Sequence, residues 1–411
     1  MRTILYNLLL YFSRILLPLA SLFSSKVKKY YVGHINLLNR IKINLESNSS
    51  PLFWVHCSSV GEFEQGLPVI ELLKQEHPTW KVVVTFFSPS GYEAVNHSII
   101  DYKFYFPYDT KTNASTFLEI VKPSMVLFIK YEYWYHFLNE LNKRHIPIFS
   151  VSSIFRPTQT FFKPWGSWNR NMLQKFTYFM VQDKTSLQLL ASIGLTNVKI
   201  TGDTRFDRVL KIREDTQSFP EINTFINGKR VGVIGSLRSE DDDIILPFIN
   251  SNPHYKYIIA PHDISEKHIV KIEEAIQSTV RYSLLKEDDL DKKVLIIDSI
   301  GKLSKLYRLA NFAYVGGGFS DGIHNILEPA VYNIPVFFGN KYFKKYKEAT
   351  DLITLNAAFP ISSTQDFISQ LKKMDDKVVL NEVKSNIANY VELNKGAAIK
   401  VVQLINQLDK K

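Results

Sequence analysis

The sequence is poor in cysteine, since Cys57 is the only one among 411 residues. An internal disulfide is therefore impossible, and a reducing compartment suits such a chain. No group of cysteines and histidines has the spacing of a zinc site, and no short internal repeat or low-complexity tract is present. A disulfide framework, a structural zinc site and a short-repeat architecture are thus excluded.

The composition is otherwise that of a folded protein. Hydrophobic residues make up 45% of the chain, and the charged residues are of both signs. A length of 411 residues exceeds what one core usually supports, so two domains are expected. The net charge of +10 and the pI of about 9.2 favour acidic partners: anionic lipid, phosphorylated small molecules or nucleic acid. Basicity alone does not choose among them.

The amino terminus carries a long apolar run over residues 4–23, interrupted only by Asn7 and Arg14. As a helix this run measures about 30 Å, which is the thickness of a bilayer core. Positive charge precedes it only at Arg2 and follows it at Lys26, Lys28 and Lys29. This charge pattern opposes secretion and favours a membrane anchor within residues 1–25, with the rest of the chain in the cytoplasm. A spanning helix and a helix lying in the interface both remain open.

Short apolar runs alternate with longer amphipathic ones, first in residues 26–212 and again in residues 230–411. Such alternation predicts an α/β fold in which helices cover both faces of a parallel sheet. The polar stretch 213–229 has turn formers without a clear period and is predicted to be a linker. The predicted strands are residues 51–56, 80–87, 125–130, 146–152, 178–183, 230–236, 255–261, 293–298, 312–318 and 334–340.

Polar or glycine-bearing loops follow five of these strands, at residues 56–66, 235–241, 261–263, 299–302 and from 316 onwards. In open α/β sheets, ligands bind beyond the carboxyl ends of the strands. We therefore expect two Rossmann-like domains that face a cleft lined by these loops.

The stretch of residues 316–340 places three glycines close to Asn325 and Glu328. Asn-x-x-Glu at a helix start is a capping signal, in which both side chains satisfy backbone N–H groups. Alternatively, the glycines let a ligand approach the backbone, and the helix start faces its negative charge. The residues alone leave both interpretations open.

Six features in order along the chain resemble the 3-deoxy-D-manno-octulosonic acid (Kdo) transferases of lipopolysaccharide synthesis. They are the amino-terminal anchor and the motifs SSVGE (58–62), EYW (132–134), TGDTRFD (201–207), IDSIGKLSKLY (297–307) and GIHNILEPA (322–330). The resemblance implies a glycosyltransferase-B fold and an inverting, metal-independent transfer of Kdo. The implied donor is CMP-Kdo, with no further cofactor. The implied acceptor is a phosphorylated lipid A precursor at the cytoplasmic face of the inner membrane.

Glu62 matches the general base of that family, which removes a proton from the acceptor hydroxyl. From the residues alone, Ser59-x-x-Glu62 is equally well a capping box, although Gly61 in its first turn weakens that interpretation. Arg205 stands where relatives carry a lysine that stabilises the transition state, and a hinge cation is its alternative. Lys130 departs from the glutamate of many relatives. The nearby Glu132 could share that role, or the two could simply form an ion pair.

Three loops match the nucleotide contacts of the family. The matching residues are Pro261, His262, Ile300, Gly301, Lys302, Asn325, Ile326, Leu327 and Glu328. Two of them depart from the usual pattern, because His262 stands for arginine and Lys302 for glutamate. The alternative to a nucleotide contact is that His262 is an ordinary histidine of a surface loop.

Two further segments are interpreted as structure. Acidic residues at the start of 240–249 are typical of a helix cap, not a metal site. The aromatic and basic run 340–349 is expected to face anionic lipid or the nucleotide sugar instead of nucleic acid. Two rival functions are a transferase of the same fold that uses a UDP-sugar and a catalytically inactive, basic lipid-binding protein. The sequence makes no prediction of oligomeric state.

Overall fold

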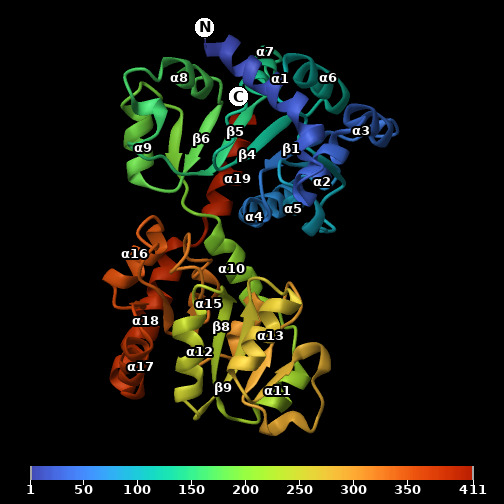
Figure 1. Ribbon diagram of the computed structural model, residues 1–411. Coiled ribbons are helices and arrows are strands. Elements are labelled where there is room, and N and C mark those ends of the chain that lie inside the picture. The colour runs from blue at the N-terminus through green and yellow to red at the C-terminus, as the bar shows by residue number, and fades with distance from the viewer. Residues whose placement is uncertain (1, 410–411) are drawn as a thin grey trace. The chain divides into compact units, whose positions relative to one another are not determined.

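The computed structural model describes residues 2–409 and divides into two compact units. Unit 1 comprises Met1–Arg208 and Lys395–Lys411, and unit 2 comprises Val209–Asn394. Each unit contains a seven-stranded parallel sheet with helices on its faces (Figure 1). The strand orders are β3-β2-β1-β4-β5-β6-β7 in unit 1 and β10-β11-β9-β8-β12-β13-β14 in unit 2. The predicted α/β class with two Rossmann-like domains is confirmed.

Unit 1 alternates strands and helices along most of its length. Its strands are β1 (Leu52–Cys57), β2 (Lys81–Phe86), β3 (Tyr102–Tyr105), β4 (Met125–Ile129), β5 (Ile148–Ser153), β6 (Tyr178–Val181) and β7 (Val198–Ile200). Its helices are α1 (Arg2–Ala20), α2 (Ser25–His34), α3 (Leu37–Leu45), α4 (Val60–Glu76), α5 (Pro89–Ala94), α6 (Lys111–Val121), α7 (Tyr135–Lys143), α8 (Ser167–Leu173), α9 (Lys184–Ala191) and α19 (Ala397–Asp409). Helix α10 (Arg205–Glu214) begins in unit 1 and ends in unit 2.

Side chains of β1 alternate between the two faces of the unit 1 sheet. Phe53, Val55 and Cys57 pack in the core cluster that also holds residues of α4 and α19. Trp54 packs in the opposite cluster, with residues of α3, α6 and α7. Both faces are therefore covered, which explains why the strands of this sheet are continuously apolar.

Unit 2 repeats this architecture. Its strands are β8 (Arg230–Leu237), β9 (Tyr255–Pro261), β10 (Thr279–Arg281), β11 (Val294–Ile296), β12 (Phe312–Val315), β13 (Val336–Gly339) and β14 (Ala358–Ile361). Its helices are α11 (Pro220–Ile226), α12 (Asp242–Ser251), α13 (Glu266–Ala275), α14 (Leu303–Leu306), α15 (Leu327–Ala330), α16 (Lys347–Thr354), α17 (Thr364–Lys372) and α18 (Lys377–Asn394).

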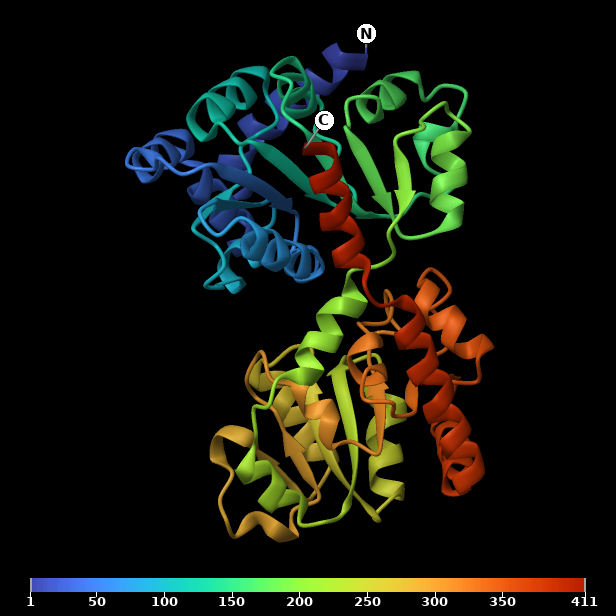
Figure 2. The same cartoon turned by 180° about the vertical axis from the view of Figure 1, so that it is seen from behind.

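The unit boundaries differ from the predicted domains in two places. Residues 213–229, predicted to be a linker, contain the end of α10 and helix α11, whose Ile222 and Phe225 are buried in the unit 2 core. The carboxyl-terminal helix α19 lies in unit 1 and not in the second domain, because its apolar face packs against α4 (Figure 2). The Asp207 carboxylate holds its start by accepting the N–H groups of Gly396 and Ala398 at 2.7 and 3.0 Å.

Helix α1 is long and apolar enough to cross a membrane, judged by length and composition. One side of it is attached to unit 1 by polar contacts. The Tyr6 hydroxyl donates to Asp109, and Asn7 Oδ1 lies 2.7 Å from His136 Nε2. Most of its apolar side chains are exposed: Ile4, Leu5, Leu8, Leu9, Phe12, Ile15, Leu16 and Leu19. The helix therefore presents an uncovered apolar surface beside the folded unit, as a membrane-associated segment does.

Candidate active site

Glu62 lies in the first turn of α4, directly after the carboxyl end of β1. Ser59 caps this helix, since its hydroxyl accepts the N–H of Glu62 at 3.4 Å. The Glu62 carboxylate in turn accepts the N–H of Ser58. The Ser59 half of the predicted capping box is present, whereas Glu62 accepts from Ser58, one residue before the cap, and this bond fixes the carboxylate at the end of the strand.

The surroundings of Glu62 favour its protonated, neutral form more strongly than the surroundings of a solvent-exposed glutamate do. Burial is the main cause that raises its pKa, to about 7, and the negative charge of Glu132 adds to this effect. The Ser58 N–H, His56 and Lys130 act in the opposite direction but do not offset it. A carboxylate with a pKa near the working pH is well suited to accept a proton from a hydroxyl group.

Glu132 is buried beyond the end of β4 and is surrounded by hydrogen-bond donors. Ser58 Oγ donates to Glu132 Oε1 at 2.6 Å, and the Trp134 indole donates to Oε2 at 2.6 Å. His56 Nε2 lies 3.0 Å from the same Oε2. Burial alone raises the pKa of a carboxyl group, but the His56 interaction and the donated hydrogen bonds outweigh it, and the pKa of Glu132 is lowered. Glu132 is therefore a fixed negative charge.

Lys130 follows β4 in a left-handed backbone conformation, with φ +66°, which a residue with a side chain adopts rarely. Its N–H donates to Val151 O at 3.0 Å, so the turn is tied to β5. The charge of Lys130 favours the ionised forms of both Glu62 and Asp203. A cation at this position therefore faces the carboxylates of the site.

Arg205 is held by the buried Asp203, which precedes it by two residues. The guanidinium donates to Asp203 Oδ2 through Nε at 2.9 Å and Nη2 at 2.6 Å. Asp203 Oδ1 also accepts from Gln65, one turn after Glu62 on α4, at 2.9 Å. This chain of contacts fixes Arg205 relative to α4. The four predicted catalytic residues thus lie in one region of unit 1, and their roles stay predictions.

The predicted nucleotide loops all lie in unit 2. Pro261 is buried at the end of β9, whereas His262 is exposed and its N–H donates to Leu237 O at 2.9 Å. The rings of His262 and His324 lie 4.6 Å apart, and Arg238 Nε lies 3.2 Å from His324 Nε2. Burial is the main cause that lowers the pKa of His324, to about 4, with the charges of His262 and Arg238 contributing. His324 is therefore neutral at physiological pH.

Asn325 and Glu328 form a compact turn before and within the short helix α15. Asn325 Oδ1 accepts the N–H of Leu327 at 3.2 Å, and Asn325 Nδ2 donates to Glu328 Oε1 at 3.2 Å. The Asn325 half of the capping interpretation is thus present, while Glu328 binds a side chain. Ile326 and Leu327 are fully buried. Only their backbone could reach a ligand.

The third predicted loop follows β11. The Ile300 side chain is 85% exposed, and Gly301 has φ +91°, a conformation that favours glycine. Lys302 Nζ donates to Ser299 Oγ at 2.8 Å and lies over the Tyr282 ring, 5.1 Å from its centroid. Lys302 is thus folded back onto its own unit, and Ile300 is the residue of this loop that projects outward.

Two glycines of the 316–318 loop are required by close packing within unit 2. A Cβ atom on Gly316 would lie 2.1 Å from Ser236 O, and one on Gly318 would lie 2.4 Å from Gly339 O. The backbone of β12 and its loop therefore approaches β8 and β13 too closely for a side chain. This packing accounts for the two glycines without a ligand.

The acidic start of α12 has structural partners. Asp241 accepts the N–H groups of Arg238 and Gly317 at 2.9 and 3.0 Å and the Tyr314 hydroxyl at 2.8 Å. Asp242 pairs with Lys271 at 2.8 Å. Among residues 2–409, no group of His, Cys, Asp and Glu side chains has the arrangement of a metal site.

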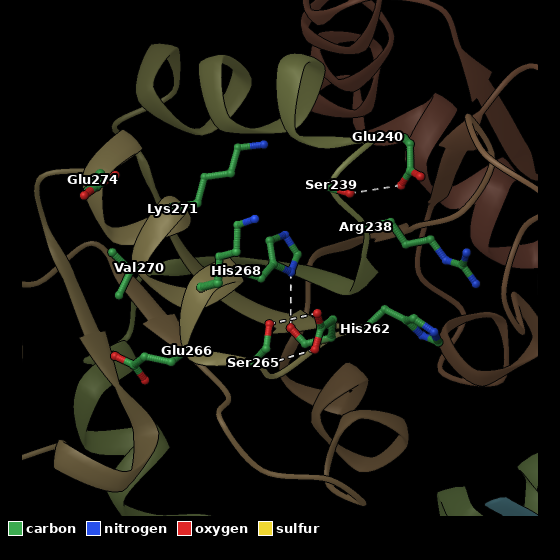
Figure 3. Close-up of a pocket in the computed structure, with 12 residues that line it drawn as sticks. Arg238, Ser239, Glu240, His262, Ser265, Glu266, His268, Val270, Lys271 and Glu274 are labelled. Atoms are coloured by element: carbon green, nitrogen blue, oxygen red, sulfur yellow. Dashed lines mark hydrogen bonds between the residues drawn. The ribbon is translucent and has the colours of Figure 1, made fainter. Parts of the chain in front are cut away.

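A pocket of about 940 Å³ opens beside His262, between the loops that follow β8 and β9 and helix α13 (Figure 3). Arg238 and His262 lie at one end of it, and Lys271 and His268 lie deeper along α13. Its lining is of mixed charge: Arg238, Lys267 and Lys271 stand beside the acidic residues Glu240, Asp263, Glu266 and Glu274.

Sequence reasoning overlooked four side chains that the fold brings to these sites: His56 and Asp203 in unit 1, and Arg238 and His324 in unit 2. Asp203, Arg238 and His324 lie inside motifs or loops already singled out, so proximity to them was the available signal. His56 opens the segment 56–66 that the sequence singled out, but only the pairing of β1 with its neighbours reveals its surroundings.

The family model described as 3-deoxy-D-manno-octulosonic-acid transferase (kdotransferase) matches residues 36–208, which include the whole sheet of unit 1. This segment of unit 1 thus matches the Kdo transferase family model. A curated Kdo transferase from Rickettsia typhi is 24% identical over 385 residues, which are 90% of this chain and 82% of that protein. The recognition from sequence motifs is thereby confirmed along most of the chain.

Two further similar proteins carry names other than Kdo transferase. A bifunctional glycosyltransferase/methyltransferase from Fusobacterium nucleatum is 27% identical over 86% of the chain, and the chain spans 57% of that protein's length. The crystal structure of a glycosyltransferase from Rickettsia africae has a TM-score of 0.60 at 12% identity. It covers 89% of this chain and 100% of that one, and at this identity the similarity shows the fold.

Proposed function

We propose that this protein transfers Kdo from CMP-Kdo to a phosphorylated lipid A precursor, on the cytoplasmic face of the inner membrane. The observation that carries the proposal is Glu62. Its carboxylate is fixed by the α4 cap, has a pKa near 7, and belongs to the SSVGE motif inside the Kdo transferase domain. The exposed apolar face of α1 and the net charge of +10 suit a phosphorylated lipid acceptor at a membrane.

In the proposed reaction, the acceptor hydroxyl attacks the anomeric carbon of Kdo while the Glu62 carboxylate takes its proton. The bond from the anomeric carbon to the phosphate of CMP breaks, and CMP leaves with the bonding electron pair. Attack opposite to the leaving group inverts the anomeric centre. Arg205, fixed by Asp203, would offset negative charge on the donor carboxylate or the departing phosphate, so no metal ion is assigned to this step.

Unit 2 is proposed to bind the donor. Glu328 would accept hydrogen bonds from the ribose hydroxyls, and the Ile326 and Leu327 backbone would approach the phosphate. Pro261, His262 and the 300–302 loop would contact the rest of CMP. The pocket of about 940 Å³ beside His262 offers space next to these contacts.

The test is Kdo transfer from CMP-Kdo to a tetraacyl lipid A precursor by the full chain in detergent. Glu62→Gln should retain CMP binding and lose transfer, because the amide cannot accept the proton. Glu64→Gln is the matched control, since it removes a charge two residues away on the same helix and should leave transfer intact. Normal turnover by Glu62→Gln would exclude Glu62 as the base.

The second candidate is a transferase of the same fold that uses a UDP-sugar. His262 and Lys302 favour it, because both depart from the residues expected around CMP. A thermal-shift panel with CMP, UDP and GDP separates the candidates. Preferential stabilisation by CMP supports Kdo transfer, and preferential stabilisation by UDP supports the rival.

A further inference from the structure

His56 stands at the centre of a buried hydrogen-bond chain that starts from the pairing of β1 with β2. The two strands are parallel and pair His56 with Thr85, so both side chains lie on one face of the sheet, with Trp54 two residues before. The Trp54 indole donates to Thr85 Oγ1 at 2.8 Å, and Thr85 Oγ1 lies 2.9 Å from His56 Nδ1. All three residues are fully buried.

The partners of His56 determine which ring nitrogen carries hydrogen towards Glu132. The Thr85 hydroxyl, which accepts from Trp54, can donate to Nδ1, and the Thr85 carbonyl lies 3.1 Å from the same atom. Nε2 lies 3.0 Å from Glu132 Oε2, outside the angles of a regular hydrogen bond. Because an ionised carboxylate only accepts, Nε2 bears a hydrogen in every protonation state that satisfies both neighbours.

Glu132 receives all of these contacts without reaching solvent. It is 4% exposed, and its oxygens are occupied by Ser58 Oγ and the Trp134 indole in addition to the approach of His56. A carboxylate so enclosed has no surface left for substrate. Its effect on a reaction must pass through a neighbour, and Ser58 provides the link, because its hydroxyl binds Glu132 while its N–H binds Glu62.

We propose that His56, Ser58 and Trp134 hold Glu132 as a permanent buried anion beside Glu62, and that this anion strengthens the hold of Glu62 on a proton beyond the effect of burial. Glu132 and His56 are then positioning residues, and of these three residues only Glu62 contacts the substrate. This inference rests on the proposed function for its effect on catalysis, although the coupling between the two carboxyl groups stands on the geometry of unit 1.

The other charged groups near Glu62 oppose this effect and make it measurable. Lys130, beyond β4, and His56, on β1, both favour the ionised form of Glu62, as does the N–H of Ser58. Glu132 is the negative charge with the largest effect on Glu62. Removing Glu132 should therefore make Glu62 more acidic.

The first experiment follows the Glu62 carboxyl group directly by ¹³C NMR in the full-length protein without substrate. Carboxyl-labelled glutamate supplies the signal, and the Glu62→Gln variant assigns it. We expect Glu62 to titrate near pH 7 in the wild type. In Glu132→Gln it should titrate about one pH unit or more lower, since a like charge within a few ångströms raises a carboxyl pKa by this amount. An unchanged or higher titration point in Glu132→Gln would overturn the proposal.

The same variants give a second readout in the pH profile of kcat/KM. The acid limb, where activity falls because Glu62 is protonated, should move to lower pH in Glu132→Gln by the shift that NMR measures. Glu64→Gln removes an equal charge from the same helix and should leave the limb in place. If the NMR shift occurs but Glu62→Gln still turns over, the coupling stands and Glu62 is not the base; if the wild type does not transfer Kdo at all, the coupling stands and the proposed function fails.

His56→Gln tests whether the neighbours of Glu132 keep it ionised. Trp134→Phe repeats this test with a smaller change if the first variant does not fold. Each should let Glu132 take up a proton more easily, so that the two carboxyl groups titrate in overlapping steps in place of one. A single unshifted Glu62 step in a folded variant of either kind would show that these residues do not hold the charge of Glu132.

Discussion

The raised pKa of Glu62 predicts that the native residue costs unit 1 stability at neutral and alkaline pH. Burial raises the pKa of this carboxyl group from 4.5 to about 7, so the folded protein binds more protons than the unfolded chain between these pH values. Stability therefore falls as the pH rises from about 4.5 to about 7. The unfavourable contribution is absent below this window and complete above it. Glu62→Gln, which does not titrate, should lack that loss.

The size of the effect follows from the two pKa values. The interval between 4.5 and about 7 corresponds to about 3 kcal/mol at about 1.36 kcal/mol per pH unit, which is an upper limit. Because water screens a half-buried side chain in part, we expect about 1 to 2 kcal/mol. For a unit of about 200 residues, this gain raises the melting temperature by about 2 to 8 °C.

Differential scanning calorimetry of the full chain in detergent checks this prediction at pH 8 and at pH 4.5. Glu62→Gln should melt above the wild type at pH 8 and at the same temperature at pH 4.5. Glu64→Gln is the control, since its carboxylate is 40% exposed and pairs with Arg208. It should show no gain at pH 8. A gain of equal size at both pH values, or none at pH 8, would refute the reasoning.

Three further predictions concern the supports of the site. Asp203→Asn removes the charged partner of the half-buried Arg205 guanidinium. It should lower the free energy of unfolding by about 2 kcal/mol or more at pH 7, measured by urea unfolding, and should also lower transfer activity. Deleting residues 397–411 uncovers the core beneath α19 and should make unit 1, but not unit 2, sensitive to limited proteolysis. Asp109→Ala removes the acceptor of two α7 N–H groups and of Tyr6, and should release α1 to protease at a cost of about 1 to 2 kcal/mol.

The strands that sequence patterns predict are the central ones. All ten predicted strands are present, and the four that were not predicted, β3, β7, β10 and β14, are the outermost strands of the two sheets. A central strand of a covered parallel sheet is buried on both faces and gives a continuous apolar run. An edge strand has one partner and mixed burial, as Val198–Ile200 shows, so its residues carry no such signal.

The unit boundaries were harder to predict for a related reason. Ile222, Phe225 and Ile226 follow helical spacing, but the polar residues around them resemble a linker. Helix α19 has a clear apolar face, yet the sequence does not say which sheet it covers. Its return to unit 1 is a long-range contact, and composition and periodicity are local properties.

The side chains of the site that belong to sequence motifs could be predicted, whereas those placed by strand register could not. Glu62 and Asn325 were predicted from motif spacing and from the family resemblance. His56 acquires its role only because β1 lies between β2 and β4, which bring Thr85 to one side and the Glu132 turn to the other. A lone histidine at the end of an apolar strand has no sequence signature for such surroundings.

The two interpretations of Ser59-x-x-Glu62 are compatible, because a cap and a base make different demands on the same carboxylate. One oxygen of Glu62 accepts the N–H of Ser58, next to the cap residue Ser59, and this bond fixes the side chain without using its second oxygen. A base requires an oriented carboxylate with a lone pair to spare and a raised proton affinity, and burial beside Glu132 supplies the latter. The cap thus provides the rigidity that a base needs at the end of a strand, and the same turn can stabilise α4 and hold the reacting group in place.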